Sequence, residues 1–424
     1  MGGQIMKLIR LLILIPFIAL THGDDLYLLK GAKVFLGDNG FVAKDVLVDD
    51  GKIILVDDFI DNIETGTVLD MQGKYITPGL LVFSSLGLLE IGALSETNDT
   101  GSDIYNAGFD PSRAYNPFSQ AVRLNRAKGV TSTVNTPSAS GYFSGMLTFT
   151  KINDGMKQKK QGPLGLVTSY GQSYNDSRAA NLMYMEDLFS YVRTNYDDNY
   201  ADMTQFMLGT TNEYKFTSRD FKAIKKVLDN AIPLVVQVNK ATDILNVLKF
   251  AEAQEIELVL WGANEGHMVA NEIAAAGVPV VMDPLNNIPS SFDSLNATYE
   301  NVTRLNEAGV EMAFYYEQGA GAHNAYLATQ SAGNSVAMGL DYSEALKSIT
   351  SNPADIFGLV NVGYIAQGYD ADLVVWDNDP LELMSSVEMV MIDGTKQDLS
   401  NRYKELTDRY TKELDKPNSY RSRD

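Results

Sequence analysis

The chain has 424 residues, of which 45% are hydrophobic and 21% are charged, a balance that excludes a largely disordered protein. A chain of this length can bury a large core, so one large domain with a smaller one is expected. The formal net charge of −20 argues against nucleic acid or an anionic membrane surface as a partner.

The first 23 residues depart from the globular pattern. Lys7 and Arg10 precede an apolar run at 11–20 that is too short to span a bilayer comfortably, and Gly23 follows it. This arrangement predicts a secretory signal peptide at 1–23, with an uncleaved anchor as the alternative. The chain contains no cysteine, so we predict export to a bacterial periplasm, with no membrane attachment once the signal is removed.

Short strands separated by turns are predicted between residues 26 and 76. Asp50-Gly51 stands between apolar runs at 45–48 and 53–56 and predicts a hairpin. A similar strand-rich stretch occurs at 363–376. Neither stretch is long enough to fold alone, so we predict that 24–77 and 361–397 pair into one composite β-sandwich.

Strand-like and helix-like segments alternate between these two stretches, which is typical of a parallel α/β arrangement. Strands are predicted at 80–86, 129–135, 164–170, 234–239, 257–262, 278–283 and 311–317, and helices at 218–229, 241–254, 265–275, 298–307 and 324–338. Seven strands with an eighth left open fit a (β/α)₈ barrel over 78–360, with its site at the C-terminal strand ends.

Two further segments flank this pattern. Residues 175–205 are predicted to be an insertion over the barrel, with a helix at 182–196 that is either a lid or a plain structural excursion. Residues 398–424 are predicted to be a charged C-terminal helix, at 398–416, and a tail.

Several motifs identify a family resemblance. Pro78-Gly79 leads into the apolar run 80–83 and then into Ser84 and Leu86. This stretch, together with 129–134, 140–154, 351–359 and 363–376, resembles the amidohydrolase superfamily, and in particular its imidazolonepropionase-like exported members. The resemblance implies a barrel with a sandwich. It also implies a metal-dependent hydrolase of amide, lactam or ester bonds in rings and small peptides, with zinc or another divalent ion as cofactor.

The family's metal ligands are replaced where the resemblance places them. Ser84 and Leu86 stand where the family has a first His-x-His pair, and Gln237 and Asn239 stand where a second segment has one. Gly262 replaces a further histidine, and Glu317 is the nearest match to the catalytic aspartate. Amide oxygens are poor ligands for a borderline-soft ion, so we predict that these positions are vestigial and that no catalytic metal is bound.

The only histidines are His22, His267 and His323, and His22 lies in the predicted signal. His267 is expected to be exposed in the first turn of a helix. Glu317 and His323 could act as a metal-free base and its orienting group, and are the predicted catalytic pair if the chain is an enzyme. The same site would use Lys240, Trp261 and Tyr315 as pocket residues.

Two functions follow from this reading. The first is an exported amidohydrolase-like protein without hydrolytic activity, acting as a non-catalytic subunit or binding partner of an active paralogue and able to bind a small molecule. The alternative is an active hydrolase of non-peptide carbon–nitrogen bonds in a small cyclic amide or peptide, working through an altered or metal-free site.

Overall fold

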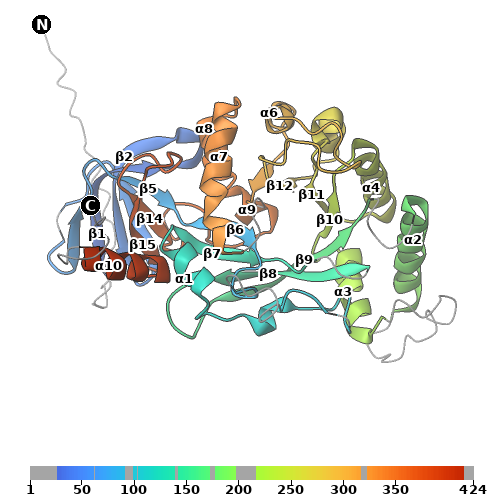
Figure 1. The fold of residues 1–424 in the computed structure, drawn as a ribbon, viewed down its shortest axis with the longest axis horizontal. Coiled ribbons are helices and arrows are strands. Elements are labelled where there is room, and N and C mark those ends of the chain that lie inside the picture. Colours follow the sequence, from blue (N-terminus) through green and yellow to red (C-terminus); the bar gives the residue numbers. More distant parts are fainter. Residues whose placement is uncertain are drawn as a thin grey trace, which may run out of the picture.

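The computed structural model describes residues 26–61, 63–90, 99–102, 104–138, 142–171, 177–196, 216–316 and 322–414. A β-rich part built from both ends of the chain stands beside a larger α/β part (Figure 1). The predicted signal peptide lies outside the described residues. Within the described part of the chain, no helix has the length and apolar character needed to cross a membrane.

The smaller part is a single curled sheet whose strands come from both ends of the chain. Its members are β1 (Tyr27–Phe35), β2 (Phe41–Asp49), β3 (Lys52–Asp57), β4 (Thr67–Asp70), β5 (Tyr75–Pro78), β14 (Leu373–Trp376), β15 (Val387–Ile392) and β16 (Thr395–Lys396). The order is β16-β15-β14-β5-β1-β2-β3, with β4 beside β1. The antiparallel pair β14–β5 joins the two ends, so the prediction of a composite sandwich is confirmed.

Turn chemistry sets the register inside this sheet. Asp50 and Gly51 have φ of 45° and 77°, and they connect the antiparallel strands β2 and β3 as predicted. The first of the short strands predicted between residues 26 and 76 is β1, whose register with β2 slips between Leu29 and Ala32.

The larger part is an eight-stranded barrel sheet. Its strands are β6 (Leu80–Ser84), β7 (Val130–Asn135), β8 (Phe143–Lys151), β9 (Lys160–Ser169), β10 (Leu234–Val238), β11 (Leu258–Gly262), β12 (Val280–Met282) and β13 (Met312–Phe314). They lie in chain order. The eighth strand, which the sequence left open, is β8, and it runs antiparallel to both β7 and β9.

Backbone hydrogen bonds bridge the two ends of the barrel sheet. Phe314 N, on β13, donates to Ser348 O at 2.8 Å, and Leu81 N, on β6, donates to Ile349 O at 3.0 Å. The segment Ser348–Ile349 therefore fills the gap between the first and last strands, and the barrel prediction is confirmed.

Apolar side chains from all eight strands fill the barrel interior. They are Leu81, Phe83, Val134, Leu147, Phe149, Leu164, Val167, Val235, Val259, Val281 and Ala313. A second, larger cluster joins the opposite face of the strands to the helices. The interior is thus a packed core, and any site must lie at its C-terminal rim.

Helices cover the outside of the barrel. They are α1 (Gln120–Arg126), α2 (Arg178–Asn195), α3 (Ser218–Leu228), α4 (Ala241–Gln254), α5 (Ala270–Ala275), α6 (Asn301–Glu307), α7 (Ala328–Ala337), α8 (Tyr342–Lys347), α9 (Asn352–Ile356) and α10 (Arg402–Leu414), with 3₁₀ turns η1 (Gly37–Asn39), η2 (Pro111–Ala114), η4 (Gly266–Val269) and η5 (Ala322–Leu327). Helix α4 matches its prediction. The helices predicted at 265–275 and 324–338 each begin with a 3₁₀ turn, η4 and η5.

Candidate functional site

The candidate site is the barrel mouth, which we define as the C-terminal ends of β6, β10, β11 and β13. Gln237 alternates with Val235, Trp261 with Val259 and Tyr315 with Ala313, so all three side chains share the inner face of the sheet. The structure therefore brings these three predicted residues together at one end of the barrel core.

The barrel mouth combines aromatic with polar side chains. The rings of Trp261 and Tyr315 pack edge to face, with centroids 5.9 Å apart. Beside them, Ser169 Oγ donates to Gln237 Oε1 at 3.3 Å. Lys240 is half-buried and occupies the N-cap position of α4. This arrangement places two nearly perpendicular aromatic rings beside a side-chain amide.

Asn239 occupies the space that a side chain at position 262 would need. A Cβ atom built on Gly262 would lie 2.4 Å from Asn239 Oδ1, and Gly262 has φ of +98°. Any side chain at position 262 would collide with the Asn239 amide and strain the backbone. The packing at positions 239 and 262 is therefore linked.

Two buried polar atoms at the mouth have no hydrogen-bond partner. They are Asn239 Oδ1, an acceptor, and Trp261 Nε1, a donor. They belong to neighbouring strands, since Gln237 pairs with Trp261 in the β10–β11 register. An unpaired buried polar atom costs roughly 1–3 kcal/mol, so a ligand that satisfied both atoms would gain that energy.

The first two predicted ligand positions are poorly placed for a site. Leu86 is fully buried in the cluster between the strands and the helices. Ser84 is half-buried, and strand alternation puts it on the face opposite to Phe83, which points into the barrel. Asn135, which the sequence did not single out, fixes this segment by donating from Nδ2 to Leu86 O at 2.8 Å.

The predicted catalytic pair is not assembled by the described residues. Glu317 lies outside them, and the pairing with His323 stays a prediction. His323 lines a surface cavity beside α1 and α10. His267 is half-buried rather than exposed as predicted, and burial together with Arg304 lowers its pKa.

Arg178 forms two ion pairs that link the start of α2 to the first turn of α4 and to the loop after β12, and we call this group the clamp. The sequence did not reveal these ion pairs. Arg178, at the start of α2, donates from Nε to Asp243 Oδ2 at 2.7 Å and pairs through its NH2 group with Asp293. Asp243 belongs to the first turn of α4 and is 2% exposed, and Asp293 lies in the loop after β12. The insertion helix is therefore tied to the strand ends.

Replacing Arg178 by Met should lower the free energy of unfolding by about 1–3 kcal/mol, because it leaves the Asp243 carboxylate buried without its cation. Arg193→Met on the same helix is the control, since Arg193 is exposed and donates hydrogen bonds to the neutral oxygens of Gln254. Urea unfolding compares the two variants, and equal losses would contradict the clamp.

Other carboxylates at the mouth are already engaged in the fold. Glu265 is 3% exposed, and its Oε2 accepts from Ala241 N at 3.0 Å, capping α4, while its Oε1 accepts from Asn296 N at 2.9 Å. Asp283 is 1% exposed, and its Oδ1 accepts from Leu285 N at 3.0 Å and from Ser331 Oγ at 3.3 Å. These groups stabilise the strand ends, and we assign them no part in chemistry.

Comparison with known proteins agrees with this architecture. Residues 117–396 match the Amidohydrolase family. The chain belongs to this family. An amidohydrolase from Thermotoga maritima superimposes with a TM-score of 0.76 at 27% sequence identity, covering 89% of this chain and 100% of that one.

More distant relatives share the fold. A zinc complex of atrazine chlorohydrolase from Arthrobacter aurescens superimposes with a TM-score of 0.51 at 15% identity, covering 91% of this chain and 99% of that chain. The amidohydrolase tasK of Hapsidospora irregularis is 23% identical over 397 residues, which is 83% of this chain. This amidohydrolase chain spans about 40% of the length of tasK.

Amidohydrolases usually bind a divalent metal, and the described residues of this chain do not fit one. Among them, no group of three or more His, Asp or Glu side chains is placed to hold an ion. At the predicted ligand positions Gln237 and Asn239 the side chains are neutral amides, and a zinc-type ion prefers imidazole, thiolate or carboxylate ligands. We therefore derive no reaction step through a metal.

Proposed function

We propose that this amidohydrolase-family protein binds a small molecule at the barrel mouth and does not hydrolyse it by the metal-dependent route. The observation that carries the proposal is the contact between Asn239 and Gly262. A side chain at position 262 would meet Asn239 Oδ1 at 2.4 Å, so a histidine there requires the Asn239 amide to move. Without imidazole ligands the mouth lacks the ion that would activate water.

The unpaired atoms of the mouth support a binding role. Trp261 Nε1 can donate to a carbonyl oxygen, and Asn239 Oδ1 can accept from an N–H group. A secondary amide or lactam carries both groups side by side. The edge-to-face pair of Trp261 and Tyr315 adds an apolar wall for a flat ring.

Metal analysis and activity assays test the absence of hydrolysis. Purified protein, incubated with or without Zn²⁺ and then dialysed, should retain far less than one transition-metal ion per chain. It should also leave a library of cyclic amides intact, whereas a histidine-complete family member assayed in parallel turns some of them over. Stoichiometric zinc would contradict the proposal. So would turnover that a Glu317→Gln variant abolishes, which is the result expected of the alternative metal-free hydrolase.

A titration tests the binding role itself. Hydantoin, a cyclic amide, should change the fluorescence of Trp261, and Asn239→Ala should weaken the response. Trp261→Phe removes the reporting tryptophan. Any fluorescence change that remains in this variant comes from Trp376, which is buried at the junction with the sandwich. An equal response in the wild type and in Asn239→Ala would contradict the assignment. Association with an active paralogue, and export, stay predictions.

A further inference from the structure

A cavity of about 550 Å³ opens where η5, α1 and α10 meet, away from the residues that define the mouth. Its polar rim includes Lys128, His323, Tyr326, Asn401, Tyr403 and Lys404. Its floor is apolar and includes Leu124, Val387 and Leu399. The volume lies within the usual range of small-molecule sites.

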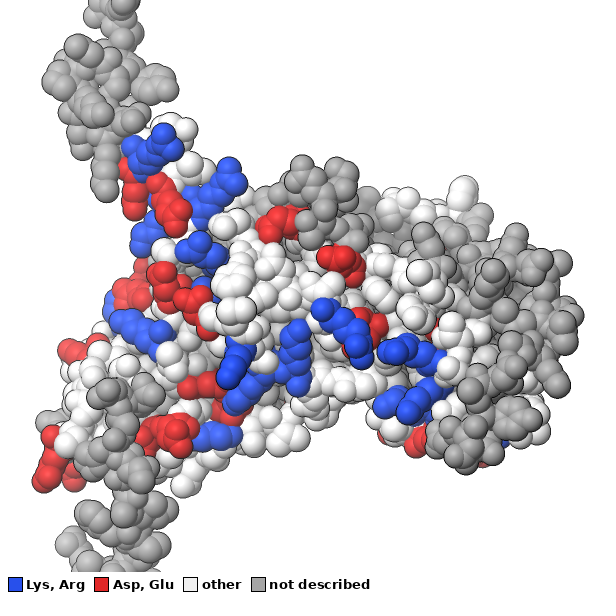
Figure 2. Space-filling model, turned by 90° about the horizontal axis from the view of Figure 1, so that it is seen from below, with Lys and Arg blue, Asp and Glu red and all other residues white. Residues whose placement is uncertain are grey.

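The described lining of this cavity is positively charged, whereas the chain as a whole is negatively charged. The described part of its lining contains two lysines, one histidine and no carboxylate, although the net charge of the chain is −20. Among the described residues neither Lys128 nor Lys404 has a carboxylate within ion-pair distance. Figure 2 shows that Lys and Arg side chains elsewhere on the lower face are interleaved with Asp and Glu. A concave site with cations alone concentrates anions.

Hydrogen bonds from a buried side chain hold the η5 wall of the cavity in place. Asn125, fully buried in α1, donates from Nδ2 to the carbonyl oxygens of Ala322 and His323, each at 3.1 Å. Its Oδ1 accepts from Tyr326 N at 2.7 Å. One side chain thus sets the path of η5, and the site residues of η5 need no ligand to be held in place.

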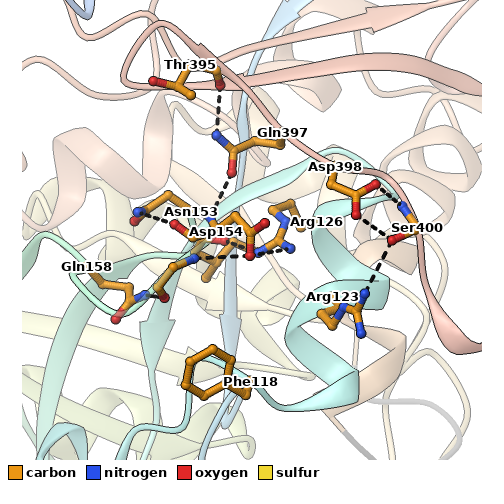
Figure 3. Close-up of polar contacts among 12 residues, drawn as sticks. Phe118, Arg123, Arg126, Asn153, Asp154, Gln158, Thr395, Gln397, Asp398 and Ser400 are labelled. Carbon is orange, nitrogen blue, oxygen red and sulfur yellow. Dashed lines mark hydrogen bonds and ion pairs between the residues drawn. The ribbon is translucent and has the colours of Figure 1, made fainter.

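The C-terminal wall is anchored as well. Arg123, on α1, donates to Ser400 Oγ at 3.3 Å (Figure 3). Arg123 NH2 also lies 3.9 Å from Glu405 Oε1 on α10. Nearby, Gln397 Oε1 accepts from Asp154 N at 2.8 Å, and Asp154 Oδ1 lies 3.4 Å from Arg126 NH2 (Figure 3). The chain entering α10 is therefore tied to the barrel on both sides.

We propose that this cavity binds a small organic carboxylate with an apolar or aromatic body. Lys128 and Lys404 supply the charge for the carboxylate, and the leucine and valine floor supplies the surface for the body. The Tyr326 ring, whose centroid lies 5.8 Å from Lys128 Nζ, gives the body a face to pack against. The lining residues that the structure describes include no arginine, whose fork suits phosphate, so a carboxylate is favoured over a phosphate.

Isothermal titration with phenylacetate tests the proposal, with benzyl alcohol as the uncharged probe and inorganic phosphate as the probe without an apolar body. Phenylacetate should bind saturably in the millimolar range, more tightly than either of the others. Lys128→Met with Lys404→Met should weaken it by about tenfold or more, since roughly 1.4 kcal/mol of attraction is lost. Methionine keeps the apolar stem of each side chain.

Lys222→Met is the matched control, because Lys222 is exposed on α3 and does not line the cavity. It should leave the phenylacetate affinity unchanged. Absence of saturable binding would overturn the proposal, as would binding that survives the double substitution. Equal affinity for benzyl alcohol or for phosphate would also overturn it. These outcomes are independent of the barrel mouth, because none of the three substituted lysines lies there.

Discussion

Replacing Lys151 by Met should lower the free energy of unfolding by about 3–5 kcal/mol, because it leaves the buried carboxylate of Asp372 without its cation. Lys151 ends strand β8 and its side chain is 1% exposed. Its Nζ lies 2.6 Å from Asp370, 2.8 Å from Asp372 and 2.6 Å from Asp393. These three aspartates belong to the C-terminal part of the sandwich sheet, whereas Lys151 belongs to the barrel, so this cluster joins the two parts of the molecule.

The charge state of the cluster follows from its surroundings. Burial alone would lower the pKa of Lys151, but the three carboxylates, led by Asp372, raise it above the ordinary lysine value. Burial raises the pKa of Asp372, and Lys151 opposes this shift. We therefore expect Lys151 to be charged at neutral pH, and removing it leaves the buried Asp372 carboxylate without a compensating charge.

Urea unfolding at neutral pH measures the effect of Lys151→Met. Lys159→Met is the matched control, because its Nζ also lies 2.6 Å from Asp393 but its side chain is 59% exposed. An exposed pair of this kind contributes about 0–1 kcal/mol. Adding Asp372→Asn to Lys151→Met should recover part of the loss, since it removes the most deeply buried charge. Similar losses for Lys151→Met and Lys159→Met, or no recovery, would contradict this account.

The same cluster shows what the sequence could predict about the fold. The stretch 363–376, which contains Asp370 and Asp372, was identified as a returning sandwich strand, and the pairing of β14 with β5 confirms it. The partner of these acids could not be predicted. Lys151 is separated from Asp370 by 219 positions, and its strand, β8, is joined to β7 and β9 with no helix between them among the described residues. Strand β8 forms antiparallel pairs with β7 and β9, so alternation of strands and helices gives no signal for it.

The candidate site, like the fold, could be predicted from the sequence only in part. Matching by motif put Gln237, Asn239, Trp261 and Tyr315 at strand ends, and the structure confirms that position. The clamp of Arg178 joins residues 65 and 115 positions away, which no local pattern reveals. The sequence also could not show that the Asn239 amide fills the place of a side chain at position 262, since this depends on how two neighbouring strands end.

The contact between positions 239 and 262 leads to the second prediction of a large effect. Replacing Gly262 by Ala should lower the free energy of unfolding. Its φ of +98° is a strained conformation for alanine, which costs about 1–3 kcal/mol. The new Cβ would also meet Asn239 Oδ1 at 2.4 Å and Val238 O at 3.5 Å, and such overpacking adds a further ~1–3 kcal/mol. Asn239→Ala alone should be nearly neutral, because the Oδ1 atom that it removes has no hydrogen-bond partner.

A double-mutant cycle separates the two costs. In the Asn239→Ala background, Gly262→Ala should retain the backbone strain and lose the collision, which gives a coupling of at least about 1 kcal/mol. Gly277→Ala is the control for strain alone, because Gly277 has φ of +64° and no atom within 4 Å of its added Cβ. Additive effects at positions 239 and 262 would show that the amide can move aside. A histidine at position 262 would then have room, and the proposal of a binding site without a metal would lose its support. Coupling of the expected size would mean that a metal-binding histidine can return at position 262 only if Asn239 changes as well.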